Sequence, residues 1–255
     1  MTMEVEIIPV LSDNYIYLFH DNKTQITVVV DPAEAAPVMQ VLNKKGWPLT
    51  HIINTHHHWD HIGGNTELKK RYNCEIIGPA SEIKRIPAMD HLLRDGDTLQ
   101  LGRFKAKIFE VPGHTTGHII YWFEEEDVLF SGDTLFSLGC GRLFEGTPEQ
   151  MWSSLQKIRG LPEQTRVYCT HEYTLSNGAF ALTLEPDNEE LKEYLKRVNS
   201  LRQDNKPSLP SSIALEKQTN PFLRVDCLPF QKAGNFLGQD PVAIFTEIRK
   251  RKDQF

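Results

Sequence analysis

Cysteine is scarce in this sequence, and its placement excludes two kinds of stabilised fold. The 255 residues include only four cysteines, Cys74, Cys140, Cys169 and Cys227. None belongs to a Cys-x-x-Cys pair, so the spacing excludes a zinc finger. A disulfide framework is typical of short secreted chains. We therefore interpret all four cysteines as free thiols.

Long apolar runs are also missing. No uninterrupted stretch approaches the roughly 20 apolar residues that a membrane helix needs. The first residues, Met1 to Glu6, have neither a basic n-region nor an apolar h-region, so we expect no signal peptide. These absences predict a cytoplasmic protein without a membrane partner.

Acidic residues outnumber basic residues, and this balance limits which partners the protein can bind. The net charge of −6 argues against nucleic acid as the main partner. At 40% hydrophobic and 24% charged residues, the composition is that of an ordinary globular protein. We expect a monomer, which the composition itself does not indicate. The run from Arg249 to Lys252 is an exception to the acidic background. From the residues alone, it is a solvated basic end of a helix.

The chain divides by its pattern into a β-rich part and a helical part. Short strands alternate with helices up to residue 172, and helical spacing dominates afterwards. We predict an α/β domain over residues 1–172 and a helical domain over residues 173–255. The predicted strands are 4–10, 14–19, 26–30, 50–54, 74–78, 99–101, 104–111, 119–123, 128–130 and 166–170. The predicted helices are 35–45, 62–72, one from the cap Thr147 to Gly160, one with its apolar stripe over 191–201, and 242–250.

A cluster of histidines follows the strand predicted over 50–54. His56, His58, Asp60 and His61 lie within six residues. Neutral imidazole is the commonest ligand of zinc and similar metals, and carboxylate compensates charge. His56 and His58 are two apart on an extended segment and can project to one side, whereas Asp60 and His61 follow a turn. A solvated polar loop is the alternative, but this density of ligands favours a metal site.

Three further strand ends carry residues of the same kind. His114 lies in a glycine-bounded loop, Asp133 follows an apolar strand, and His171 ends the last predicted strand. A single His or Asp at such a position is usually a turn former or a satisfied polar residue. All of these positions fall just beyond strands, however, where α/β folds gather functional loops.

The order of these motifs resembles the metallo-β-lactamase superfamily. It runs T-H-x-H-x-D-H, P-G-H-T-x-G-H, G-D-T and then a strand-end histidine. The resemblance implies an αββα sandwich that binds up to two metals, and it leaves His57 and His118 outside the ligand set. The implied ligands are His56, His58 and His114 for the first metal, Asp60, His61 and His171 for the second, and Asp133 as a bridge between them.

Within the superfamily, the sequence resembles the glyoxalase II (hydroxyacylglutathione hydrolase) family along nearly its whole length. The similarity covers segments 13–16, 139–147, 171–174 and 249–255 and the helical C-terminal part. Some relatives have Lys and Tyr where this chain has Arg142 and Phe144, so the cation is kept and a phenol hydroxyl is lost. The resemblance implies that glutathione is contacted by Arg142, Leu143, Phe144, Tyr173, Arg249 and Lys252.

The implied reaction is hydrolysis of S-(2-hydroxyacyl)glutathione thioesters. S-lactoylglutathione would yield glutathione and D-lactate, the second step of methylglyoxal detoxification. Two metals about 3.5–4 Å apart would supply a hydroxide nucleophile and a Lewis acid. Asp60 would orient the hydroxide and Asp133 would bridge the metals, which gives both a catalytic role. We expect zinc, with iron or manganese as alternatives, because no thiolate narrows the choice.

Other functions compete with this one. An iron-dependent glutathione persulfide dioxygenase would use fewer metal ligands and would lack the long helical C-terminal part. A β-lactamase would be exported. A non-catalytic or nucleic-acid-processing member of the superfamily is a further alternative, which the full ligand set and the acidic charge disfavour. The chain has no Gly-x-Ser-x-Gly elbow that would indicate a serine nucleophile.

Overall fold

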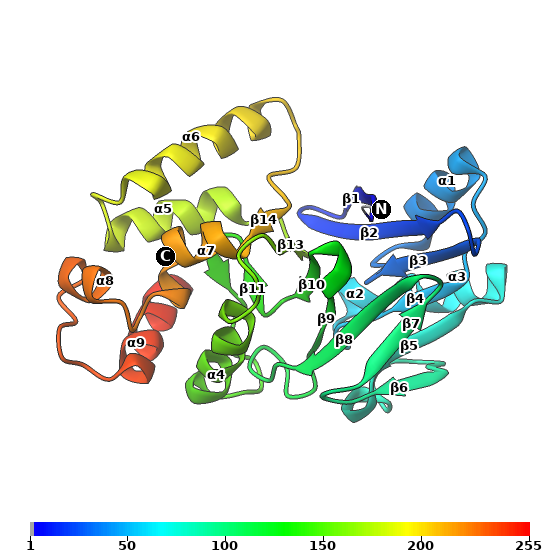
Figure 1. The fold of residues 1–255 in the computed structure, drawn as a ribbon, viewed down its shortest axis with the longest axis horizontal. Helices are drawn as coiled ribbons and strands as arrows, with labels where there is room; N and C mark the ends of the chain where they lie inside the picture. Colours follow the sequence, from blue (N-terminus) through cyan, green and yellow to red (C-terminus); the bar gives the residue numbers. More distant parts are fainter. Residues whose placement is uncertain (1–2) are drawn as a thin grey trace. The chain divides into compact units, whose positions relative to one another are not determined.

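The computed structural model of the protein describes residues 3–255 (Figure 1). The chain forms two compact units, each described here by itself. Unit 1 contains the residues up to Glu110 together with Gly117–Gly132, and unit 2 contains Val111–Thr116 together with Asp133–Phe255. Among residues 3–255, no helix has the length and apolar composition that crossing a membrane requires.

The first sheet of unit 1 contains both antiparallel and parallel strands. Its order is β1-β2-β3-β4-β5-β6. The first three strands pair antiparallel, with Ile7 opposite Tyr17, and the remaining pairs are parallel, with Val30 opposite Ile53. Parallel neighbours need a crossover connection, which here passes through helices. The strands are β1 (Val5–Val10), β2 (Asn14–Asp21), β3 (Ile26–Val30), β4 (His51–Ile53), β5 (Glu75–Pro79) and β6 (His91–Leu93).

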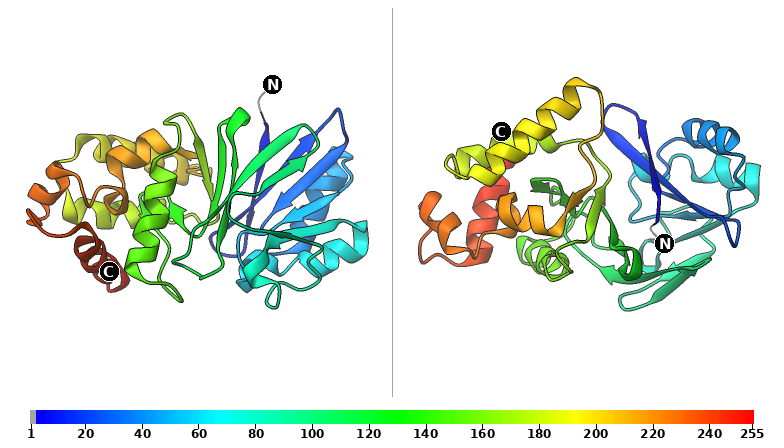
Figure 2. Two further views of the ribbon diagram at one scale, coloured as in Figure 1. Left: turned by 60° about the horizontal axis from the view of Figure 1, so that its bottom comes forward. Right: turned by 45° about the horizontal axis from the view of Figure 1, so that its top comes forward.

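Helices cover one face of this sheet. Helix α1 (Ala35–Lys45) has the predicted bounds and ends at Gly46, whose φ of 68° is the left-handed conformation that glycine adopts readily. Its apolar residues Val38 and Leu42 are buried in a cluster with side chains from the sheet and from α3 (Asn65–Tyr72). Figure 2 shows α1 and α3 on the same side of the sheet. This face is one half of the core of unit 1.

The helix predicted over residues 62–72 is wrong at its start. The structure has a short α2 (Trp59–Ile62) and then α3, separated at Gly63 and Gly64. The amide of Gly64 donates to the carbonyl of Pro32 at 2.7 Å, and a Cβ on Gly63 would lie 2.4 Å from the carbonyl oxygen of Ala33. The helix is therefore interrupted at the two glycines, which allow the backbone to pack closely against the turn after β3.

The other face of the first sheet packs on a second, antiparallel group of strands. These are β7 (Thr98–Leu101), β8 (Phe104–Glu110), β9 (Ile119–Phe123) and β10 (Val128–Gly132). The ring centroid of Phe19 lies 5.7, 5.5 and 5.9 Å from those of Phe104, Phe123 and Phe130. Aromatic side chains thus fill the inside of the sandwich in unit 1.

Unit 2 is mostly helical. Helix α4 begins with the predicted capping box, in which Thr147 and Gln150 exchange hydrogen bonds. Helices α5 and α6 lie side by side (Figure 1), and the stripe on α6 is buried as predicted. The elements are β11 (Leu135–Phe136), β12 (Gly139–Cys140), α4 (Pro148–Arg159), β13 (Arg166–Cys169), α5 (Thr174–Leu184), α6 (Glu189–Gln203), β14 (Ser211–Ser212), α7 (Ile213–Thr219), α8 (Leu228–Ala233) and α9 (Pro241–Asp253).

Candidate metal centre and substrate site

The loop after β4 presents two histidines whose ring nitrogens face each other. Nε2 of His56 lies 3.0 Å from Nδ1 of His58. His56 is fully buried, with the ring of His118 stacked on it at a centroid distance of 4.7 Å. Two imidazole nitrogens at this distance repel unless a proton or a cation lies between them. The arrangement fits a pair of ligands to one metal.

His57, between these two histidines, turns to a different partner. Its Nδ1 hydrogen-bonds with the carboxylate of Glu82, which is 1% exposed. A buried carboxylate is costly without such a partner. That His57 lies outside the ligand set stays a prediction.

Asp31, at the end of β3, fixes the histidine loop. Its two carboxylate oxygens accept from the backbone amide and the hydroxyl of Thr55 at 2.8 and 2.7 Å. Oδ2 also lies 3.1 Å from Nδ1 of His61. A carboxylate that accepts a hydrogen bond from one ring nitrogen of a histidine orients the second ring nitrogen toward a metal. Here that nitrogen is Nε2, which lies 3.7 Å from Oδ2 of Asp60.

Asp60 is itself held by Asn14, the first residue of β2. The amide nitrogen Nδ2 of Asn14 donates to Oδ2 of Asp60 at 3.0 Å and to its backbone carbonyl at 3.3 Å. Sequence reasoning missed this role of Asn14 and the role of Asp31. Both residues stand at strand ends, as the ligands do, and that position was the available signal.

In unit 2, Asp133 meets two of the predicted ligands. Its Oδ2 lies 3.3 Å from Nε2 of His114, and its Oδ1 lies 3.4 Å from Nε2 of His171. The hydroxyl of Thr170 donates to Oδ1. All four side chains are buried. One oxygen for each histidine is the geometry that a bridging carboxylate needs.

Outer contacts orient these two histidines. Nδ1 of His114 donates to the backbone carbonyl of Arg142 at 2.9 Å, so Nε2 faces Asp133. The ring of Tyr173 stacks on His171, with centroids 4.8 Å apart and planes at 7°. Donation of the second ring nitrogen to a carbonyl is usual for histidines that bind metals.

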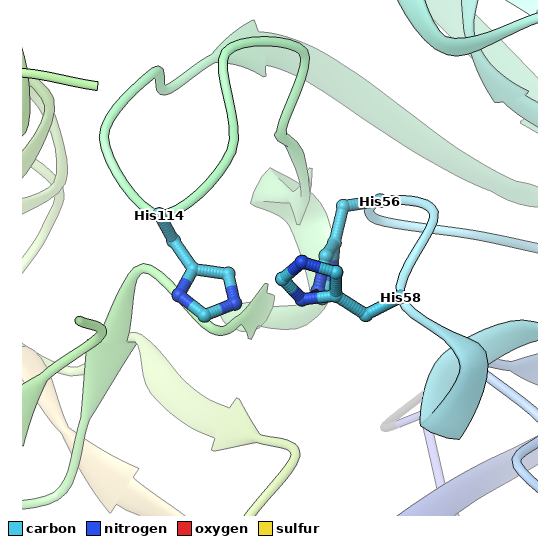
Figure 3. Close-up of side chains that lie close together, drawn as sticks. All are labelled: His56, His58 and His114. Atoms are coloured by element: carbon cyan, nitrogen blue, oxygen red, sulfur yellow. Dashed lines mark hydrogen bonds between the residues drawn. The ribbon is translucent and has the colours of Figure 1, made fainter. Parts of the chain in front are cut away.

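The predicted ligands form two close groups. The ligand atoms of His56, His58 and His114 lie within 4.8 Å of one another. Figure 3 shows these three rings turned toward one another. The ligand atoms of Asp60, His61 and His171 satisfy the same criterion. Neutral imidazoles combined with carboxylates fit divalent zinc, iron or manganese.

Several of the candidate substrate-binding residues of unit 2 have solvent-exposed side chains. The side chain of Arg142 is 66% exposed, Phe144 is 61% exposed, and Tyr173 is 37% exposed. The ring of Phe144 lies 5.1 Å from that of His114, and Leu143 is half-buried. These groups are accessible to a ligand beside His114 and His171.

The two cations expected on the terminal helix differ in exposure. Lys252 is half-buried and donates to Ser176, 3.1 Å from its hydroxyl. Burial lowers the pKa of the Lys252 ammonium, and the nearby guanidinium groups of Arg249 and Arg142 lower it further. Arg249 is 5% exposed, and its guanidinium donates to the Cys140 carbonyl. The assignment of Arg249 to substrate binding stays a prediction.

Comparison with known proteins defines the class. The sequence profile of the metallo-β-lactamase superfamily matches residues 11–171, and the profile of the hydroxyacylglutathione hydrolase C-terminus matches residues 172–255. The structure of ETHE1 from Myxococcus xanthus is similar with a TM-score of 0.69 and 25% identity, covering 98% of this chain and 90% of that one. The fold is thus the metallo-β-lactamase fold with a helical C-terminal region, as predicted.

Relatives that are similar in sequence over the full length identify the family within this superfamily. A hydroxyacylglutathione hydrolase from Methylococcus capsulatus is 49% identical over 99% of both chains. One from Rhodospirillum rubrum is 50% identical, covering 100% of this chain and 99% of the relative. The chain belongs to the hydroxyacylglutathione hydrolase family, which confirms the family predicted from the motifs.

Proposed function

We propose that this protein hydrolyses S-(2-hydroxyacyl)glutathione thioesters, with S-lactoylglutathione as its substrate and glutathione and D-lactate as products. The reaction would complete the breakdown of methylglyoxal. The observation that carries the proposal is the pair of ligand groups, His56, His58 and His114 with Asp60, His61 and His171, in a chain of this family.

The proposed cofactor is a pair of divalent metal ions, with zinc the expected metal. When bound, such ions activate water at neutral pH and polarise a carbonyl oxygen. Asp133 is suited to hold both ions because each of its oxygens faces a different histidine. Asp60, fixed by Asn14, is placed to accept a hydrogen bond from the attacking water and so to orient it. The seven ligands proposed are those predicted from the motifs.

We propose that the glutathione part of the substrate lies over Arg142, Leu143, Phe144, Tyr173 and Lys252. Glutathione carries two carboxylates, and charge-assisted hydrogen bonds from guanidinium and ammonium groups hold such anions well. Burial is the main cause of the lowered pKa of Lys252, and the guanidinium groups of Arg249 and Arg142 lower it further, so a carboxylate bound there would have several positive charges nearby. Phe144 offers an apolar face in place of a hydroxyl.

The division of labour would follow the predicted domains. Residues 1–172 would carry the catalysis, and residues 173–255 would contribute to substrate binding. We propose a monomer that acts in the cytoplasm. The four cysteines are all free thiols, as expected of a protein from a reducing compartment.

A persulfide dioxygenase remains the alternative enzyme. The group of Asp60, His61 and His171 favours hydrolysis because it provides ligands for a second metal beside the first. A dioxygenase with a single iron would have no use for that group.

Thiol release from S-lactoylglutathione, followed together with dissolved oxygen, tests the proposal. We expect stoichiometric glutathione and D-lactate without oxygen uptake, and loss of the activity after chelation. Oxygen consumption with glutathione persulfide, in the absence of thioester hydrolysis, would refute the proposed function in favour of the dioxygenase.

A further inference from the structure

Lys252, the cation on α9 that is proposed to bind a glutathione carboxylate, is held by uncharged partners. Its ammonium nitrogen Nζ donates to the hydroxyl of Ser176 at 3.1 Å and lies 3.4 Å from the backbone carbonyl oxygen of the same residue. Among residues 3–255, no carboxylate is in ion-pair contact with Nζ, and the neighbouring Asp253 pairs with Arg249 instead. The charge of Lys252 is therefore not neutralised by an ion pair.

Two aromatic rings lie beside the same ammonium group. Nζ is 5.2 Å from the ring centre of Phe255 and 5.6 Å from that of Phe180. The two rings contact each other edge to face, with their centroids 5.5 Å apart. A cation within about 6 Å of an aromatic ring is attracted by it without losing charge. The two rings and Ser176 of α5 together restrain the ammonium group.

Phe180 and Phe255 differ in exposure. Phe180 is 2% exposed and packs in the interior, whereas Phe255 is 62% exposed. The amide of Phe255 donates to the carbonyl of Lys252 at 3.4 Å, so the chain after α9 turns back over the end of the helix. A single exposed apolar side chain is common on protein surfaces. Here, however, the exposed ring lies over the cation that is assigned to the substrate.

We propose that Phe255 is a positioning residue that holds the Lys252 ammonium group in place for a glutathione carboxylate. The inference rests on the proposed function in taking Lys252 as a glutathione contact. A lysine side chain that is immobilised on binding loses rotamer freedom, and this loss weakens association. A ring that restrains Lys252 in the free protein removes part of this cost before the substrate binds. Because the ring is uncharged, the full charge of Lys252 remains for the carboxylate.

Two substitutions of Phe255 separate the aromatic face from the bulk of the side chain. Phe255→Tyr keeps an aromatic face, and Phe255→Leu keeps an apolar side chain without one. Leu237→Ala is the control, because Leu237 is 56% exposed in the same unit. Exposed positions tolerate such changes with little loss of stability, and melting of each variant checks this. Binding of S-methylglutathione to the zinc-loaded protein is measured by calorimetry, alongside steady-state kinetics with S-lactoylglutathione.

Phe255→Leu is expected to raise both the Kd for S-methylglutathione and the KM for S-lactoylglutathione by about three- to tenfold, the cost of ordering one rotamer-rich side chain. Its kcat stays within about twofold of wild type, because the glutathione contact is the same before and during the reaction. The conservative Phe255→Tyr and the control Leu237→Ala stay within about twofold in all three quantities.

A double-mutant cycle shows whether Phe255 acts through Lys252. Lys252→Met removes the charge and keeps a long side chain. In that background, Phe255→Leu is expected to cause no further change in Kd, since the cation that the ring restrains is gone. An equal effect of Phe255→Leu in both backgrounds would overturn the proposal, because Phe255 would then act on the ligand or the fold without Lys252.

Proton NMR of the free protein provides a readout without substrate. The rings shift the ε-methylene resonances of Lys252 away from ordinary lysine values, and Phe255→Leu is expected to move them back toward those values. Unmoved resonances would overturn the restraint of Lys252 by Phe255. Binding is measured without turnover, so a protein that binds S-methylglutathione but hydrolyses no thioester refutes the proposed function alone. An unchanged Kd in Phe255→Leu overturns the positioning role alone.

Discussion

Asp31 shows how a single residue can prepare a metal site. It is 1% exposed, it has a φ of 47°, and it joins Thr55 to His61. A non-glycine residue rarely holds a positive φ without compensation. Three hydrogen bonds to one carboxylate provide that compensation, and they fix the ring of His61 before any metal arrives.

Replacement of Asp31 tests this role. Asp31→Asn presents an amide donor or a weaker acceptor to Nδ1 of His61. We therefore expect the affinity for zinc at the second metal site, that of Asp60, His61 and His171, to fall by about 10- to 100-fold. Asp21→Asn is the matched control, since Asp21 is an equally buried carboxylate that accepts from Thr24 and the Arg103 amide. Chelator competition should show a decrease for Asp31→Asn alone. Equal affinities in the two variants would contradict the account.

At this scale the sequence predicted residue types better than contacts. The ligands could be predicted because several histidines and carboxylates follow strands in a recognisable order. Asp31 and Asn14 could not, because a lone polar residue at a strand end is usually a turn former and its partner is set by the fold. From the residues alone Arg249 was part of a solvated basic helix end, but it is only 5% exposed, beside the buried Ile248 and Phe245 of α9.

Among the elements, a buried acid joins α7 to the β11–β12 hairpin. One oxygen of Glu216 accepts from the amide of Leu138 at 2.8 Å and from Asn220 at 2.9 Å. The other hydrogen-bonds with the Ser211 hydroxyl. Burial raises the pKa of Glu216, although these donors oppose the increase. The hairpin is thus held by the carboxyl group of Glu216, whose raised pKa favours the protonated form.

The sign of the pH dependence follows. A carboxyl whose pKa is higher in the folded state stabilises the fold fully below its unfolded pKa, near 4.5, and this stabilisation is lost as pH rises through the folded pKa. Glu216→Gln imitates the protonated acid. We expect the Tm difference between variant and wild type to be near zero at about pH 4 and to grow in favour of the variant toward neutral pH.

Glu189→Gln is the control for that series, because the Glu189 side chain is 79% exposed. Its Tm difference should not rise with pH. A Glu216→Gln variant that is destabilised by the same amount at every pH would show that the hydrogen bonds matter and the proton does not.

Element bounds were predictable where local chemistry decides them. Gly46 ends α1, and the capping box at Thr147 starts α4, as the sequence indicated. Helix α5 was not predicted, because its Ser, Asn, Gly and Thr residues are poor helix formers. Its Gly178 instead allows Leu195 of α6 to approach closely, so packing overrides propensity. Such packing cannot be seen in a single sequence.

For the whole molecule, the proposed function draws on residues from one end of the chain to the other. The metal ligands occur between His56 and His171, and the substrate residues extend to Lys252. The order of the motifs predicted the fold and the family because few arrangements of strands bring that set of ligands together. The number of metals and the acyl group of the substrate are not encoded in any one motif.

The central claim is a two-metal thioester hydrolase, and one titration tests it most directly. Metal-free protein receives zinc in steps while hydrolysis of S-lactoylglutathione is followed, with Asp133→Ala in parallel. We predict that activity rises until two equivalents are bound, and that Asp133→Ala binds less metal and remains inactive. Full activity at one equivalent, unaffected by loss of His171, would contradict the account.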